Sequence, residues 1–141
     1  MINKKLLGRV DRVDFPELNL FDIAVKIDTG AYTSAIHCSD IRLENNQLIC
    51  NFEGHTVSFS DFSLTDVKSS NGFKENRYKI KTKVIFFGKS YRINLTLSTR
   101  DDMKFPVLIG RQFLRQKFLV DVDIENQSYK HKANEHSYTF A

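Results

Sequence analysis

Short runs in which apolar and polar residues alternate are the feature that most restricts the fold of this 141-residue chain. Alternation places every second side chain on one face of an extended strand, so that one face is buried and the other meets solvent. The longest run, Arg77–Phe87, predicts a strand whose even-numbered residues share one face. Shorter runs predict strands at Leu6–Val13, Phe21–Ile27, Ile41–Glu44, Leu48–Phe52, His55–Phe59, Tyr91–Leu97, Val107–Ile109 and Phe118–Val122, and an edge strand around Ser128–Lys132.

Turn-forming residues separate these runs. Asn45 and Asn46 lie between two of them, and Asn71-Gly72 falls within a long polar stretch. Asparagine followed by glycine is a strong hairpin signal because both residues tolerate positive φ. We therefore expect hairpins at both places.

The organisation of the chain indicates one domain. Only Arg111–Gln116 predicts a helix, and the sequence contains no repeat and no internal boundary. A length of 141 residues suits a single domain. We expect an all-β domain over residues 1–141, with a core at about 21–122 and a polar tail at 125–141.

Charge and hydropathy exclude several classes of protein. The net charge of +4 is a mild excess, which favours a solvated surface over a nucleic-acid footprint and is compatible with an acidic substrate. No apolar stretch approaches the roughly 20 residues that span a membrane. Arg9 and Asp11 interrupt the N-terminal region, which does not resemble a signal peptide. We expect a cytoplasmic protein with neither a membrane nor a nucleic acid as its partner.

Metal and cofactor signals are weak. Cys38 and Cys50 are the only cysteines, and we interpret them as free, buried thiols, with a bridge between them as the open alternative. The sequence has neither a His-Glu-x-x-His motif nor a Gly-rich phosphate loop. We therefore expect no catalytic metal, no ATP binding and no cofactor. The scattered histidines are His37, His55, His131 and His136.

Asp28-Thr29-Gly30 is the first motif that carries chemistry. It directly follows the apolar run Ala24–Ile27. Taken alone, it is accounted for by a strand-ending turn in which Asp28 bonds to nearby backbone. Later in the chain, Phe105–Leu114 combines an apolar strand, the dipeptide Gly-Arg and the start of a helix.

Together, in this order and in an all-β chain of this length, the two motifs resemble the retropepsin-like aspartic peptidases. In that fold an Asp-Thr-Gly turn lies beside a buried strand that ends in glycine. A closer similarity is to a bacterial and archaeal family named putative ATP-dependent zinc proteases, which is retropepsin-like despite that name and is linked to ATP-grasp glutamate ligases of the RimK type. The matching segments are Lys26–His37, Ser70–Gly72 with Arg77, Leu97–Arg100 with Met103, and Pro106–Arg111.

The resemblance implies that Asp28, Thr29 and Gly30 form the catalytic turn. Thr29 would bond across a dimer axis, and Gly30 would allow substrate backbone to approach. Hydrolysis by carboxylates needs two of them sharing one proton. Because the chain contains one Asp-Thr-Gly, the second carboxylate must come from a second copy, which predicts a homodimer.

The resemblance also implies a set of substrate-binding residues: Ala31, Gly72, Arg77, Arg100 and Arg111. Gly72 would give a flap its bend. Guanidinium groups bind carboxylates well, so the three arginines are candidates for binding acidic or polyglutamylated chains.

An equally weighted alternative places the three arginines in structural ion pairs with Asp101, Asp102 or Asp121. One position departs from both patterns. Tyr32 stands where classical retropepsins carry an acidic residue that pairs with the Gly-Arg arginine, and where the closer family commonly carries a basic one.

Two other functions stay open at this point. One is a non-catalytic binding module of the same fold, which would hold acidic tails without cutting them. The other is a monomeric β-barrel in which the motif is accidental.

Overall fold

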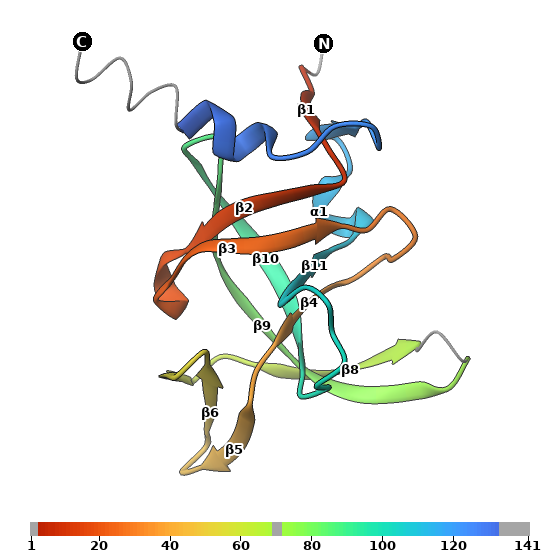
Figure 1. Cartoon of the computed structure of the whole chain (residues 1–141). Helices are drawn as coiled ribbons and strands as arrows, with labels where there is room; N and C mark the ends of the chain where they lie inside the picture. The colour runs from red at the N-terminus through yellow and green to blue at the C-terminus, as the bar shows by residue number, and fades with distance from the viewer. Residues whose placement is uncertain (1–2, 69–71, 133–141) are drawn as a thin grey trace, which may run out of the picture.

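The computed structural model describes residues 3–68 and 72–132, and strands dominate it (Figure 1). The sequence prediction of an all-β fold is confirmed. The elements in chain order are β1 (Lys5–Leu7), β2 (Val10–Phe15), the 3-10 helix η1 (Pro16–Leu18), β3 (Leu20–Ile27), β4 (Ser34–His37), β5 (Asp40–Glu44), β6 (Gln47–Phe52), β7 (His55–Phe59), β8 (Ser63–Lys68), β9 (Lys74–Phe86), β10 (Lys89–Ser98), β11 (Val107–Ile109), α1 (Arg111–Leu114) and β12 (Phe118–Val120).

A closed barrel forms the centre of the fold. Its strands follow the order β10-β4-β11-β3-β2-β9, and β9 pairs again with β10 to complete the ring. β11 runs parallel to β3 and antiparallel to β4, so it lies between the two strands that flank the Asp-Thr-Gly turn. Closure removes unpaired edges from the barrel.

The core follows from the alternation in β9 and β10. Ile80, Val84 and Phe86 are at most 1% exposed, and Leu95 is fully buried on the facing strand. These strands pair antiparallel from Lys89↔Phe86 to Thr96↔Lys79, so their apolar faces coincide. At one end Phe86 meets Phe118 with ring centroids 5.4 Å apart. The predicted face of β9 is confirmed.

Two hairpins project from the barrel (Figure 1). β5 and β6 are joined by Asn45 and Asn46, whose φ values of 51° and 62° are those of the predicted tight turn. β8 and β9 form the second hairpin, with Lys68 opposite Lys74. Gly72 adopts a φ of +87° near its tip. Ser70 and Asn71 lie outside the described residues.

The predicted edge strand at Ser128–Lys132 is wrong, because residues 127–132 are helical. Asp11 on β2 is the cause. Its carboxylate accepts hydrogen bonds from the backbone N–H groups of Ser128 and Tyr129, at 2.9 and 3.1 Å. These donors belong to the first turn of the helix, where N–H groups lack partners within the helix.

Other differences concern element boundaries. The predicted strand Leu6–Val13 is two strands, because the chain bends at Gly8 to pass the backbone of Ile124, with which a side chain at Gly8 would collide. The helix ends at Leu114 and β12 at Val120, both earlier than predicted, and neither β4 nor β8 was predicted.

Within the described parts of the chain, no helix is long and apolar enough to cross a membrane.

Candidate active site

Asp28 lies in a turn that is bonded from within. It directly follows β3, and its backbone N–H donates to the carbonyl of Ile109 on β11 at 2.8 Å. One carboxylate oxygen, Oδ1, accepts the backbone N–H of Gly30 at 3.1 Å. The N–H of Ala31 closes the turn by donating to the Asp28 carbonyl at 3.3 Å. The carboxylate is thereby oriented, and the side chain is half-buried.

Gly110 fits closely behind this turn. A Cβ atom there would lie 2.7 Å from the Tyr32 carbonyl oxygen and would collide with the Thr33 carbonyl as well. The Gly110 N–H donates to the hydroxyl of Ser34 at 2.9 Å, and Ser34 is only 2% exposed. Glycine is therefore required by space, and Ser34 satisfies a buried donor.

Arg111 contacts the turn from the start of α1. Its guanidinium donates to the Thr29 carbonyl at 2.9 Å and lies 5.9 Å from the centre of the Tyr32 ring. Its backbone N–H donates to the Ala31 carbonyl at 2.8 Å. The aromatic face of Tyr32 therefore contacts this arginine where retropepsins carry an acidic residue, through a cation–π contact.

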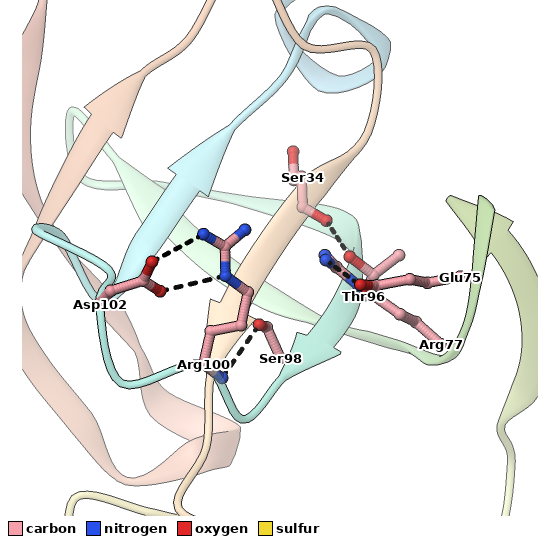
Figure 2. A network of polar contacts seen from close by, with 7 residues as sticks. All are labelled: Ser34, Glu75, Arg77, Thr96, Ser98, Arg100 and Asp102. Atoms are coloured by element: carbon pink, nitrogen blue, oxygen red, sulfur yellow. Dashed lines mark hydrogen bonds and ion pairs between the residues drawn. The ribbon is translucent and has the colours of Figure 1, made fainter. Parts of the chain in front are cut away.

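Arg77 and Arg100 form a second group (Figure 2). Arg77 on β9 donates through Nε and Nη2 to one oxygen of Glu75, at 3.1 and 2.9 Å. Arg100 donates through Nε and Nη2 to the two oxygens of Asp102, at 3.1 and 2.9 Å. Asp102 raises the pKa of Arg100, mainly through these hydrogen bonds, and Glu75 adds to the rise through its charge.

Ser34 links the two groups. Its hydroxyl binds Gly110 beside the turn, and its carbonyl accepts the hydroxyl of Thr96 at 3.2 Å. Thr96 lies on β10, two residues before Ser98, whose hydroxyl accepts the backbone N–H of Arg100 at 3.4 Å. Figure 2 shows Ser34 and Thr96 beside the two arginine pairs.

A cavity of about 190 Å³ adjoins Arg100. His37 contributes to its lining, and the ring atom Nε2 of His37 is buried without a hydrogen-bond partner among the described residues. The nearest carboxylate oxygen, on Asp101, is 3.9 Å away, which exceeds hydrogen-bond distance.

Both cysteines are free and buried, as the sequence suggested. Burial raises the pKa of Cys38 to about 12 and that of Cys50 to about 11. Neither thiol is a nucleophile at neutral pH, because the thiolate is the reactive form. Within the described residues, no group of three or more His, Cys, Asp or Glu side chains could hold a metal ion.

The candidate residues thus fall into separate places. The structure brings Asp28, Thr29, Gly30 and Ala31 together with Arg111. Arg77 and Arg100 belong to a separate polar network that contains Ser34 (Figure 2). Gly72 lies on the projecting hairpin.

The sequence reasoning missed several partners. It proposed Asp102 among three possible partners and did not identify Glu75, although the i, i+2 spacing in β9 is a visible signal. Ser34 lies within the segment Lys26–His37, and nothing local in the sequence marks it as the acceptor for Gly110.

Comparison with known proteins supports the fold. The family described as retropepsin-like aspartic endopeptidase RimB matches residues 50–131. This span contains Arg77, Arg100 and Arg111, whereas Asp28 precedes it.

Curated relatives include proteins from Shewanella pealeana and Desulfotalea psychrophila, each named probable alpha-L-glutamate ligase. They are 34% and 33% identical over 131 and 132 residues. The matches cover 84% and 85% of this chain but 29% and 28% of the relatives. The chain therefore spans less than a third of their length.

A crystal structure of the Legionella pneumophila protein Lpg0085, described as of unknown function, has a similar fold. The TM-score is 0.70 with 20% sequence identity, covering 89% of this chain and 99% of that protein. At this identity the likeness concerns the fold alone.

Proposed function

Because the chain belongs to the RimB-like family of retropepsin-like aspartic endopeptidases, we propose that it is an aspartic peptidase that works as a homodimer. The observation that carries the proposal is the geometry of Asp28. Its carboxylate is held by the Gly30 N–H at 3.1 Å on a turn tied to β11. A pre-oriented, half-buried carboxylate at the end of a buried strand is what this chemistry requires.

A two-fold axis supplies the second carboxylate. Each chain contributes one Asp28, and a C2 interface places the same residue of both copies opposite each other. Two carboxylates about 3 Å apart cannot both ionise, so the pair carries a single proton. The pair titrates as a unit, with apparent pKa values that belong to neither residue alone.

The reaction then proceeds in balanced steps. The ionised Asp28 accepts a proton from a water molecule as the water oxygen attacks the peptide carbonyl carbon, and the protonated Asp28 gives its proton to the carbonyl oxygen. In the resulting tetrahedral diol, the protonated carboxyl group passes its proton to the amide nitrogen while the C–N bond breaks. The other carboxylate accepts a proton from one diol hydroxyl, whose oxygen becomes the carbonyl oxygen of the product acid. One water is consumed, and the pair regains a single proton.

The proposed substrate is an acidic or polyglutamylated chain. Arg77 and Arg100 lie close enough together for the charge of Glu75 to affect both. Guanidinium groups bind carboxylates through paired hydrogen bonds. The relatives named as glutamate ligases support a substrate made of linked glutamates and a functional link to an ATP-grasp ligase.

Hydrolysis of an α-linked oligoglutamate tests the proposal, with wild type and Asp28→Asn compared over a range of pH. We expect cleavage by wild type alone. Asp61→Asn, at an exposed position outside the turn, is the matched control and should keep its activity. A wild-type protein that binds the oligomer without cutting it would instead favour the non-catalytic binding module.

Mixing protomers tests the shared site separately. Adding an equal amount of Asp28→Asn protein to wild type should reduce the total activity to about half, since random pairing leaves half of the wild-type protomers in mixed dimers. Unchanged activity after complete exchange of protomers would show that each chain works alone and would contradict the homodimeric mechanism.

A further inference from the structure

Two ion pairs of the same construction form part of one polar network with Ser34, Thr96 and Ser98 (Figure 2). Each joins an arginine to a carboxylate two residues away in sequence, Arg77 to Glu75 and Arg100 to Asp102. The two pairs lie at the same end of two neighbouring strands, because β9 pairs with β10 as far as Lys79↔Thr96, Arg77 lies two residues before Lys79, and Arg100 follows the end of β10 at Ser98. The charge of Glu75 also contributes to the raised pKa of Arg100. One extended ligand can therefore contact both.

The contacts of Arg100 have the geometry of carboxylate recognition. Its Nε and Nη2 atoms donate separately to the two oxygens of Asp102, at 3.1 and 2.9 Å. Parallel bonds of this kind are the arrangement in which a guanidinium binds any planar carboxylate. A glutamate side chain of a bound substrate would present the same group to the same edge of the guanidinium.

Solvent exposure makes this pair exchangeable. The side chains of Arg100 and Asp102 are 53% and 69% exposed. Ion pairs in such surroundings are weak, because water and salt screen them. An incoming carboxylate replaces the hydrogen bonds that Arg100 loses, whereas a neutral side chain would break the ion pair without forming hydrogen bonds of equal strength.

The Arg77 pair is held more firmly. The Arg77 side chain is only 14% exposed, whereas that of Glu75 is 50% exposed. Leaving a mostly buried guanidinium without its carboxylate is costly. Exchange at Arg77 therefore needs a ligand that supplies a carboxylate as Glu75 leaves.

We propose that Asp102 and Glu75 occupy the substrate-carboxylate subsites of Arg100 and Arg77, and that a glutamyl chain binds by exchanging its own side-chain carboxylates for them. This inference rests on the proposed function and adds two competing residues to it. Asp102 and Glu75 thus make the two subsites selective for carboxylates over neutral groups.

Asp102→Asn provides the test, because this side chain lies in an exposed turn where the loss of a carboxylate leaves no buried charge. The KM for an α-linked oligoglutamate should fall by about two- to fivefold, as expected for removal of an exposed competing carboxylate. Asp101→Asn is the matched control, since Asp101 is adjacent and exposed and is not paired with Arg100. It changes the net charge equally and should lower KM less. Asp102→Glu keeps the competing carboxylate and should restore the wild-type KM.

The outcomes separate the two proposals. An equal fall in KM for Asp101→Asn and Asp102→Asn would show that the effect arises from net charge alone and would overturn the proposed carboxylate exchange. A rise in KM for Asp102→Asn would show that Asp102 positions Arg100 instead of competing for it. Absence of both cleavage and binding of the oligoglutamate by wild type would refute the proposed substrate, and the inference with it.

Discussion

Replacing Ser34 with alanine tests how the turn at Asp28–Ala31 is supported. The Ser34 hydroxyl accepts the Gly110 N–H at 2.9 Å in a place where Ser34 is 2% exposed. Alanine removes the acceptor, and burial keeps water from replacing it easily. A buried donor left without a partner costs about 1–3 kcal/mol. The second contact, from Thr96, uses the backbone carbonyl of Ser34 and therefore survives the substitution.

Urea unfolding at one fixed protein concentration measures this cost. With a slope of about 2 kcal/mol per molar, in the usual range for small proteins, the midpoint should fall by about 1 M with the slope unchanged. Ser39→Ala is the matched control, because its hydroxyl bonds to the Asn51 side chain at an exposed position. Its effect should stay within about 0.5 kcal/mol.

The reasoning is refuted if Ser34→Ala and Ser39→Ala unfold at the same midpoint. In that case the Gly110 N–H would find another acceptor at little cost, and the support of the turn by Ser34 would be unnecessary.

Three other predictions concern groups outside the carboxylate exchange. Burial raises the pKa of Asp11 in the folded protein above its ordinary value of 3.8. The contribution of Asp11 to stability is therefore largest below pH 3.8 and is lost as the pH rises through its pKa in the folded protein. Asp11→Asn should flatten this decline in the free energy of unfolding, measured between acidic and neutral pH. With pKa values of about 12 and 11, Cys38 and Cys50 should resist iodoacetamide at pH 8 in the native protein and react after denaturation, as mass spectrometry would detect. Arg111→Lys loses the planar contact made beside Thr29, so we expect oligoglutamate turnover to fall while the urea midpoint changes little, and a normal turnover would contradict this role.

Much of the barrel could be predicted because its signal is local. In β9 and β10 every second residue faces the same core, so the alternation in sequence repeats the alternation in space. The turn at Asn45 and Asn46 is equally local, since these residue types adopt positive φ at little cost. The Asp-Thr-Gly motif was recognisable because its residues are consecutive in the sequence, and the bonds from Gly30 and Ala31 to Asp28 stay within four residues. Its ties to Ile109 and Arg111 are long-range and have no local signal.

The missed elements depend on contacts between distant residues. The helix at 127–132 begins where Asp11, over a hundred residues earlier, accepts its first N–H groups. No local pattern in that polar segment reports such a contact. β8 belongs to a hairpin that leaves the barrel, so neither face must be apolar; Leu64 is 61% exposed. A strand without a buried face lacks the periodic signal on which the prediction relied.

The three arginines differ in what their charge can do. Arg111 is fixed by a backbone carbonyl and an aromatic ring, both uncharged, so its role beside Asp28 is positional. Arg77 and Arg100 each form an ion pair with a carboxylate, so the opposite charges of each pair largely cancel for a ligand that is still far away. Screening limits long-range attraction between exposed charges to about 8 Å at physiological salt. With a net charge of only +4, we expect recognition of the proposed acidic substrate to arise mainly at contact, through the hydrogen bonds that its carboxylates would take over. Selectivity at such a site depends on the number and spacing of carboxylates in the ligand more than on its total charge.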